Sequence, residues 1–204
     1  MRAPAPPRRL LALDLETSGL DPKKDAIVAA GGVPIEAGTI LWGGRFRDLV
    51  DDPRSTRPRD PGALAAHQLL PSEQRGGLAL PALLERVGVE LEAGGALLVH
   101  GASIERGFLD AAAKATGRPR LPLRTVCTLA YLRAIDRHRH HLADRLPATA
   151  RSFATLPAAL APARALFALP AYPEHDPLFD ALGTAELYLV LLYRFPELHP
   201  GVAA

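Results

Sequence analysis

A run of apolar residues that ends in two carboxylates constrains the fold of this chain more than any other stretch. Residues 10–15 are apolar apart from Asp14, and Glu16 follows directly. The run is typical of a buried strand, in which alternate side chains share a face, so both acids are expected to point the same way. Adjacent carboxylates repel each other, and a hard divalent cation removes that repulsion. The pair therefore predicts a metal site; the alternative is one exposed acid and one turn or helix cap.

The composition fits a soluble globular protein with one sizeable core. The chain has 204 residues, of which 48% are hydrophobic and 23% charged, and its formal net charge of +2 does not indicate a polyanion binder. Its single cysteine, Cys127, excludes an intrachain disulfide and a cysteine zinc site. The start of the chain lacks the apolar core of a signal peptide, and no run approaches the length of a membrane span. We therefore expect a cytoplasmic protein with no membrane partner.

Positive charge is concentrated locally, between Arg118 and Arg151. Eight arginines lie in this stretch, and only Asp136 and Asp144 oppose them. Such a stretch is suited to attracting phosphates. The alternative is an ordinary solvated face.

The first third of the chain has the pattern of an antiparallel meander. We expect strands over residues 10–16, 26–35 and 39–49, followed by a proline-rich loop over residues 51–62. Helices then alternate with short strands. The expected helices cover residues 81–92, 103–116 with Ser103 as N-cap, 128–137, 151–167 with breaks at prolines, and 177–195, and the expected strands cover residues 96–100 and 121–126. This order implies a mixed sheet flanked by helices.

The start of the last expected helix carries a second group of candidate residues. Asp176 is placed to cap this helix, Pro177 suits its first position, and Asp180 lies one turn inside. His175 precedes the helix, and a histidine near a carboxylate that holds a metal is suited to act as a general base. The alternative is a surface histidine that only caps the helix.

Three segments together resemble the motifs of the DnaQ-like, or DEDDh, 3′→5′ exonucleases. Asp14-Leu-Glu16-Thr-Ser-Gly-Leu resembles the first motif, and His175-Asp-Pro-Leu-Phe-Asp180-Ala-Leu-Gly-Thr-Ala-Glu resembles the third. The second motif, His-Asn-x-x-Phe-Asp-x-x-Phe-Leu in the family, is degenerate here. It reads His100-Gly-Ala-Ser-Ile-Glu105-Arg-Gly-Phe108-Leu109. The similarity spans about residues 10–192, nearly the whole chain.

The resemblance implies an α/β fold of the ribonuclease H-like type. Its mixed five-stranded sheet has three antiparallel strands first and then parallel strands, and α-helices flank it. The exonuclease-like domain would cover residues 9–196, after a flexible N-terminus over residues 1–8 and before a C-terminal tail over residues 197–204.

The resemblance also implies an activity: hydrolysis of phosphodiester bonds at the 3′ end of DNA or RNA by a two-metal mechanism that releases nucleoside 5′-monophosphates. The cofactors would be two Mg²⁺ or Mn²⁺ ions. Asp14 would bridge them, Glu16 and Asp180 would bind the first, and Glu105 would support the second through water. His175 would take the proton of the attacking water.

Substrate contacts are implied for three further residues. Thr17 and Leu20, which follow the first two acids, would contact the terminal sugar and base, with Leu20 as an apolar wedge. His67, in a segment that loosely resembles the family's His-Gly-Ile loop, would line the same pocket; the alternative is an exposed loop histidine. The expected partner is nucleic acid with single-stranded 3′ ends, and a homodimer or a polymerase partner is left open.

Glu105 departs from the family pattern, which has Asp at this position. The extra methylene moves the carboxylate by roughly 1–1.5 Å on a fixed backbone, a shift that a direct magnesium ligand tolerates poorly. We expect activity that is retained but weaker or shifted toward manganese. The alternative is a catalytically weakened or inactive nuclease-like module that binds nucleic acid. A third hypothesis, a phosphohydrolase that opens with Asp-x-Asp, is disfavoured by Glu16 in place of the second Asp.

Overall fold

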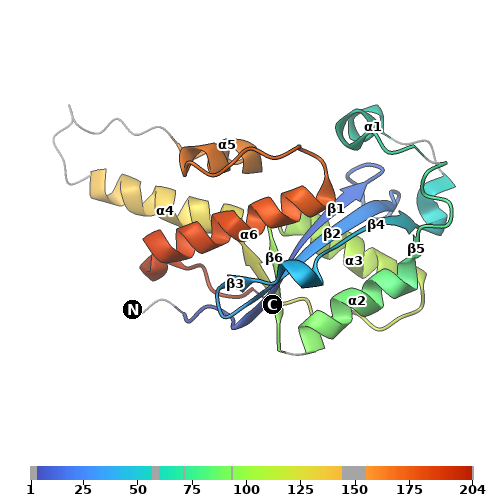
Figure 1. Ribbon diagram of the computed structural model, residues 1–204, viewed down its shortest axis with the longest axis horizontal. Helices are drawn as coiled ribbons and strands as arrows, with labels where there is room; N and C mark the ends of the chain where they lie inside the picture. The colour runs from blue at the N-terminus through green and yellow to red at the C-terminus, as the bar shows by residue number, and fades with distance from the viewer. Residues whose placement is uncertain (1–3, 57–59, 71, 93, 144–154, 204) are drawn as a thin grey trace.

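A mixed sheet with helices on both faces forms the core of the chain (Figure 1). The computed structural model describes residues 4–56, 60–70, 72–92, 94–143 and 155–203. In chain order the elements are β1 (Arg9–Thr17), β2 (Ile27–Glu36), β3 (Thr39–Ile40), the 3₁₀ turn η1 (Trp42–Gly44), β4 (Phe46–Asp51), η2 (Pro53–Thr56), α1 (Pro61–His67), β5 (Leu78–Ala79), α2 (Leu80–Glu92), β6 (Ala96–Val99), α3 (Ser103–Ala115), β7 (Thr125–Cys127), α4 (Thr128–Ala143), α5 (Leu160–Leu166), α6 (Pro177–Arg194) and η4 (Pro196–Leu198).

The sheet has the strand order β5-β4-β2-β1-β6-β7, with β3 paired to β2. The strands β1, β2 and β4 pair antiparallel, and β6 and β7 then continue the sheet parallel to β1. The expected ribonuclease H-like architecture is therefore confirmed. Each of the five longest strands overlaps one expected strand, although β7 begins only at Thr125 and β4 only at Phe46, and two-residue strands, β3 and β5, bring the sheet to seven.

The alternation of side chains along β1 decides which face carries the two acids. Leu11 and Leu13 pack in a core cluster with residues of α2 and α3, whereas Leu10 and Ala12 pack in a second cluster with residues of α4 and α6. Asp14 and Glu16 follow Ala12 by two and four residues along the strand, so their side chains lie on the same face as that of Ala12. Both acids therefore continue the α6 face of the sheet.

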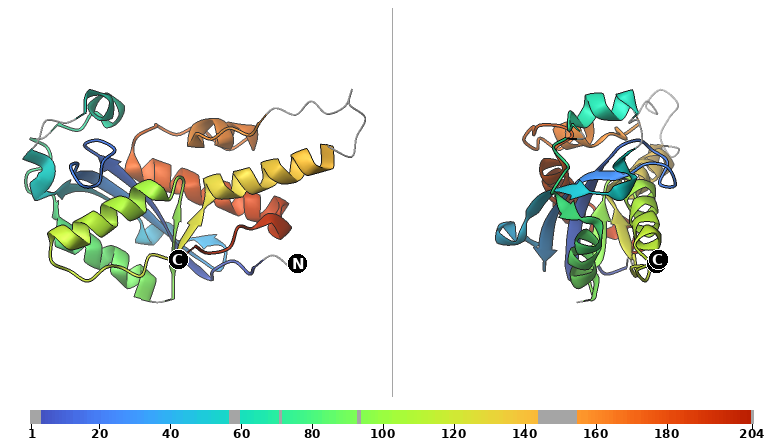
Figure 2. Two further views of the ribbon diagram at one scale, coloured as in Figure 1. Left: turned by 180° about the vertical axis from the view of Figure 1, so that it is seen from behind. Right: turned by 90° about the vertical axis from the view of Figure 1, so that its right-hand side faces the viewer.

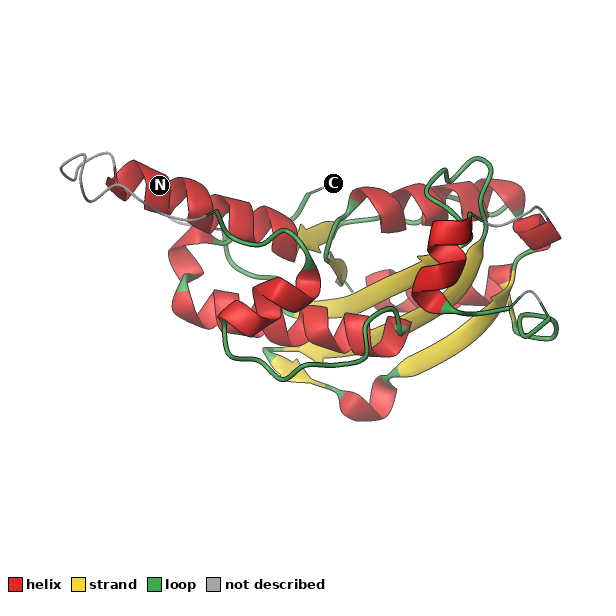
Figure 3. Cartoon of the chain, turned by 90° about the horizontal axis from the view of Figure 1, so that it is seen from above, coloured by secondary structure: helices red, strands yellow, loops and turns green. Residues whose placement is uncertain are grey.

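Helices α1 and α5 lie on the same side of the molecule, where both views of Figure 2 show them beyond the body of the sheet. Seen from above, the other helices lie along both faces of the twisted strands (Figure 3). Within the described parts of the chain, no helix is both long enough and apolar enough to cross a membrane.

Two local expectations are wrong. The strand expected over residues 39–49 is broken by the turn at Trp42–Gly44, where the N–H of Gly44 donates to the carbonyl of Leu41, 2.9 Å away. The glycines of this turn have no side chain to pack, and they do not lie between two paired strands as Gly31 and Gly32 of β2 do. Ser103 is not an N-cap but the first helical residue, because the backbone of Ala102 is already helical and places the N-cap one residue earlier. The methyl side chain of Ala102 cannot accept a capping hydrogen bond.

Helix boundaries differ in three further places. The loop expected over residues 51–62 contains η2 and the start of α1, whose N-cap Asp60 accepts from the N–H of Ala63. Helix α4 continues beyond Arg137 to Ala143. Of the helix expected over residues 151–167, residues 151–154 lie outside the described part, and only Leu160–Leu166 is helical, since Pro157 disfavours a helix before it.

Candidate active site

Asp14 and Glu16 lie near the carboxyl end of β1, where α6 packs directly against the sheet. Asp14 pairs with Gly31 of β2, and a Cβ at Gly31 would come within 2.1 Å of the backbone carbon of Pro177. Because Gly31 has no side chain, the first turn of α6 can lie on β2 at this point. This contact brings Asp180, one turn into α6, to the face that carries the two acids.

The backbone around His175 holds the start of α6 in place. Asp176 is the N-cap, and its Oδ1 accepts from the N–H groups of Leu178 at 3.0 Å and Phe179 at 3.3 Å. His175 has a left-handed backbone with φ of +61°, and its N–H donates to Oδ2 of Asp180 at 2.9 Å. The conformation at His175 therefore depends on the carboxylate of Asp180, and the histidine side chain remains exposed.

Hydrogen bonds from a buried arginine, Arg164, hold the segment that precedes His175 against α6. The guanidinium of Arg164 donates to the carbonyls of Gly183 at 2.7 Å and Pro170 at 2.8 Å, and to Oε2 of Glu186 at 2.8 Å. The hydroxyl of Tyr172 donates to the other oxygen of Glu186 at 3.0 Å. This network joins α5, α6 and the segment between them.

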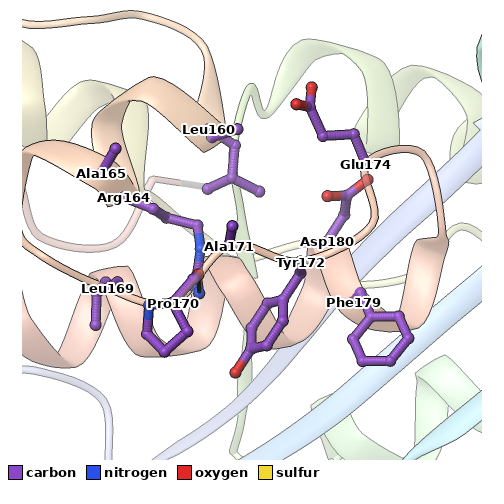
Figure 4. Close-up of a pocket in the computed structure, with 11 residues that line it drawn as sticks. Leu160, Arg164, Ala165, Leu169, Pro170, Ala171, Tyr172, Glu174, Phe179 and Asp180 are labelled. Carbon is purple, nitrogen blue, oxygen red and sulfur yellow. Dashed lines mark hydrogen bonds between the residues drawn. The ribbon is translucent and has the colours of Figure 1, made fainter.

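Figure 4 shows the small pocket between α5 and α6 that these contacts enclose. Glu174 and Asp180 lie at one end of it, and Leu169 and Pro170 lie at the other. Both acids also line the cleft described next, so the pocket opens from that cleft.

Glu105 enters the site from the first turn of α3. Its side chain is 5% exposed, and its Oε2 is buried without a hydrogen-bond partner among the described residues. Burial raises the pKa of Glu105 to about 7. A buried carboxylate oxygen without a donor is costly, which makes a cation or an ordered water the natural partner for this group.

One cleft of about 390 Å³, which we call the acidic cleft, is lined by Asp14, Glu16, Glu105, His175 and Asp180. Glu16, His175 and Asp180 come closest together, with one possible ligand atom of each within 4.8 Å of the others. The structure thus brings together all five residues that the motifs singled out for catalysis and metal binding.

Asp14, Glu16, Glu105 and Asp180 resist ionisation in the absence of a cation. Burial, followed by the charges of Glu16, Asp180 and Glu105, raises the pKa of Asp14 well above its ordinary value. Burial and then the charge of Asp180 raise the pKa of Glu16 to about 7, and burial raises that of Asp180. An oxygen-rich donor set with this much mutual repulsion fits a hard divalent cation.

The three residues expected to contact substrate are not among the described residues that line the acidic cleft. Thr17 is buried, and its hydroxyl donates to the carbonyl of Gly19 at 2.7 Å. Leu20 is 79% exposed, as an apolar wedge requires. His67 is buried in α1, and its Nδ1 accepts from the N–H of Leu69 at 3.0 Å. Their roles in substrate binding stay predictions.

Sequence reasoning missed two features of the acidic cleft. Glu174 lines it beside His175, a position that the motif comparison passed over. Residues 159–161 form another part of its wall, and the preceding residue, Ala158, is held by His100, whose Nε2 lies 2.8 Å from the Ala158 carbonyl. No pattern in residues 155–161 connected that segment to the site, and the second motif, in which His100 stands, implied no contact of that histidine with it.

Comparisons with known proteins give matches in structure only. No family model matches the sequence, and no curated protein matches it. A structure described as Exonuclease X in complex with 5′ overhanging duplex DNA is 19% identical, with a TM-score of 0.61 over 94% of this chain and 96% of that chain. A 3′-exonuclease described with a histone mRNA stem-loop is 12% identical, with a TM-score of 0.68 over 95% and 85% of the two chains.

Exonuclease I of E. coli in complex with a dT13 oligonucleotide is a further neighbour. It is 16% identical, with a TM-score of 0.70 over 93% of this chain, which spans 42% of the length of that one. At such identities the likeness establishes the architecture. The chain has the fold of the DnaQ-like 3′→5′ exonucleases, the superfamily that its motifs resemble.

Proposed function

We propose that this protein is a metal-dependent 3′→5′ exonuclease that hydrolyses phosphodiester bonds at the 3′ end of DNA or RNA and releases nucleoside 5′-monophosphates. One observation carries the proposal: four carboxylates from β1, α3 and α6 meet a histidine in a single cleft. Neighbours in fold that are described in complex with DNA or RNA support it.

The donor set is suited to two divalent cations. Asp14, Glu16 and Asp180 would hold them directly, and Glu105, with its unpaired buried oxygen, would act through an intervening water. When bound, such cations neutralise charge on the scissile phosphate, lower the pKa of the attacking water and stabilise the leaving 3′ oxygen. Mg²⁺ and Mn²⁺ are among the hard cations that carboxylate oxygens suit.

His175 is the group that would take the proton of the attacking water. Its side chain is exposed to the cleft and the solvent, and its backbone is tied to Asp180. A histidine can accept a proton near neutral pH, and contact with solvent lets it pass that proton on. Leu20 would pack against the terminal base, and Thr17 would contact the terminal sugar.

The proposal is tested with a 5′-labelled single strand incubated with Mg²⁺ or Mn²⁺. The protein should shorten the strand stepwise from its 3′ end, and the released product should be a nucleoside 5′-monophosphate. Asp14→Asn should abolish turnover. His175→Asn should lower kcat by about 10²–10⁴-fold, because the general base is lost while Asn still tolerates the left-handed backbone. His138→Asn, at an exposed position on α4, is the matched control.

Two results would contradict the proposal. Identical digestion by the protein and by Asp14→Asn would assign the activity to a contaminant. Strand binding without any product, at every metal concentration tried, would favour the nucleic-acid-binding module in which Glu105 marks a lost activity.

A further inference from the structure

A second groove lies beside the acidic cleft, over the edge of the sheet formed by β7. Its cavity of about 490 Å³ is lined by the starts of α3 and α4, by Thr125 and Cys127 of β7, and by residues 200–203. Two arginines face it, Arg106 from α3 and Arg133 from α4. We call it the basic groove, because no acidic side chain is among the described residues that line it.

The basic groove and the acidic cleft meet at one loop. Gly101, in the turn after β6, and Ser103, the first residue of α3, line both cavities. A ligand that leaves the acidic cleft over this loop therefore passes from a region of carboxylates to one of guanidinium groups. The groove is at least as large as the cleft, at about 490 against 390 Å³, so both can be occupied by parts of one extended ligand.

The chemistry of the basic groove indicates which part of a strand it would bind. Two guanidinium groups suit phosphate oxygens. The rest of the lining is small or aliphatic, with Ala102, Leu129 and Val202 among it, and the described part holds no aromatic ring on which a base could stack. Binding there would depend on charge and not on base identity, and it would weaken as salt is added.

We propose that the basic groove binds the phosphates of the strand upstream of the scissile bond, so that the protein acts on strands several nucleotides long in preference to dinucleotides. The proposal rests on the proposed function, because it extends the path of a substrate whose 3′ end lies in the acidic cleft.

Arg133 is the residue on which to test it. Its side chain is exposed, and among the described residues it makes no ion pair or hydrogen bond that a substitution would break. It lies on α4, apart from the metal-binding candidates, whereas Arg106 directly follows Glu105. Arg120, on the loop after α3 and highly exposed, supplies a control that does not line the groove.

The experiment measures binding and turnover separately. Binding of fluorescent oligo-dT is followed by anisotropy in the Asp14→Asn background, so that no substrate is consumed. For a strand of about twelve nucleotides, Arg133→Glu should raise Kd roughly tenfold and reduce the steepness of log Kd against log salt by about one. Arg133→Lys should restore most of the affinity, and Arg120→Glu should change Kd less than twofold.

Turnover is then compared on a dinucleotide and on the long strand. Arg133→Glu should raise KM for the long strand and leave kcat/KM for the dinucleotide unchanged. Equal effects on both substrates, or equal effects of Arg133→Glu and Arg120→Glu, would overturn the proposal. If the protein degrades no strand at all, the proposed function fails, whereas the anisotropy measurement still tests the groove. Circular dichroism of each variant checks that the fold is retained.

Discussion

Arg47 on β4 donates a hydrogen bond from Nε to Oδ2 of Asp176, at 2.8 Å, and so ties the sheet to the start of α6. The other oxygen of Asp176 caps the helix. The same carboxylate is close enough to the acidic cleft to raise the pKa values of Glu16 and Asp180. Asp176 thus acts both as a helix cap and as an additional negative charge beside the proposed metal site.

Two substitutions of Asp176 separate these effects. Asn accepts the same backbone N–H groups, so Asp176→Asn should lose only the partly exposed ion pair with Arg47, about 0.5 kcal/mol. Asp176→Ala also loses the cap and should cost about 1 kcal/mol more. Urea unfolding measures both. Asp176→Asn should also shift the acidic limb of the pH–activity profile to lower pH, because a neighbouring negative charge is removed. Equal destabilisation by the two variants would show that the cap contributes nothing.

The free energy of unfolding of the metal-free protein should fall as pH rises. Glu16 and Glu105 have ordinary pKa values of 4.5 that are raised to about 7 in the folded chain. Between pH 4.5 and about pH 7 the folded state binds more protons than the unfolded state. By the upper end of this pH range, each glutamate therefore lowers the free energy of unfolding by on the order of 3 kcal/mol. The raised pKa values of Asp14 and Asp180 act in the same direction.

Thermal unfolding with EDTA, compared with Mg²⁺ or Mn²⁺, measures this effect. The metal-free Tm should be lower at about pH 8 than at about pH 5, and the stabilisation by metal should be larger at the higher pH, where the carboxylates ionise and bind it. Glu105→Gln should make the Tm of the metal-free protein depend less on pH, since it removes one of the titrating groups. A Tm in EDTA that rises over this range would contradict the assignment of these buried acids.

Much of the framework could be predicted because it depends on local patterns. The alternation in β1 places Asp14 and Glu16 on one face whatever the rest of the chain does. The Asp176-Pro177 pair predicted the start of α6, which begins at Pro177 as expected. That α6 packs beside β1 did not follow from periodicity; only the resemblance to the exonuclease motifs implied that Asp180 would approach Asp14.

What could not be predicted depends on contacts between distant segments. Arg47 and Asp176 are 129 positions apart, and nothing near Arg47 marks it as a partner. The basic groove combines β7, two helix starts and the residues near the end of the chain, so no single stretch reveals it. The stretch of arginines between Arg118 and Arg151 suggested phosphate binding, yet of the arginines there that the structure describes, only Arg133 lines the groove.

Substitutions of Glu105 test whether its longer side chain limits activity. Glu105→Gln keeps the size and removes the charge, so kcat should fall by about 10²-fold. Glu105→Asp keeps the charge and draws the carboxylate back by roughly 1–1.5 Å. It should raise activity with Mg²⁺ relative to Mn²⁺, because the carboxylate must reach a water of the metal and magnesium holds its waters in a strict octahedral arrangement. Initial rates in each metal give the ratio. An unchanged ratio would mean that the longer side chain of Glu105 does not limit activity.

Gly31→Ala should displace the start of α6 and with it two of the proposed catalytic residues. The added Cβ would meet backbone atoms, 2.1 Å from the carbon of Pro177 and 2.3 Å from the nitrogen of Leu178, and neither can rotate away. The helix start must move, which should destabilise the protein by about 1–3 kcal/mol. His175 and Asp180 move with it, and a displacement of about 1 Å at a catalytic group can cost 10²-fold in kcat.

Gly43→Ala is the matched control for this substitution, because nothing lies within 4 Å of a Cβ at Gly43. Both variants are assayed well below their thermal midpoints, so that loss of activity is not loss of folded protein. Gly31→Ala should lose turnover and bind Mn²⁺ more weakly by calorimetry, while Gly43→Ala keeps both. Full activity in Gly31→Ala would contradict the close approach of α6 to β2, and with it the geometry that brings Asp180 to Asp14.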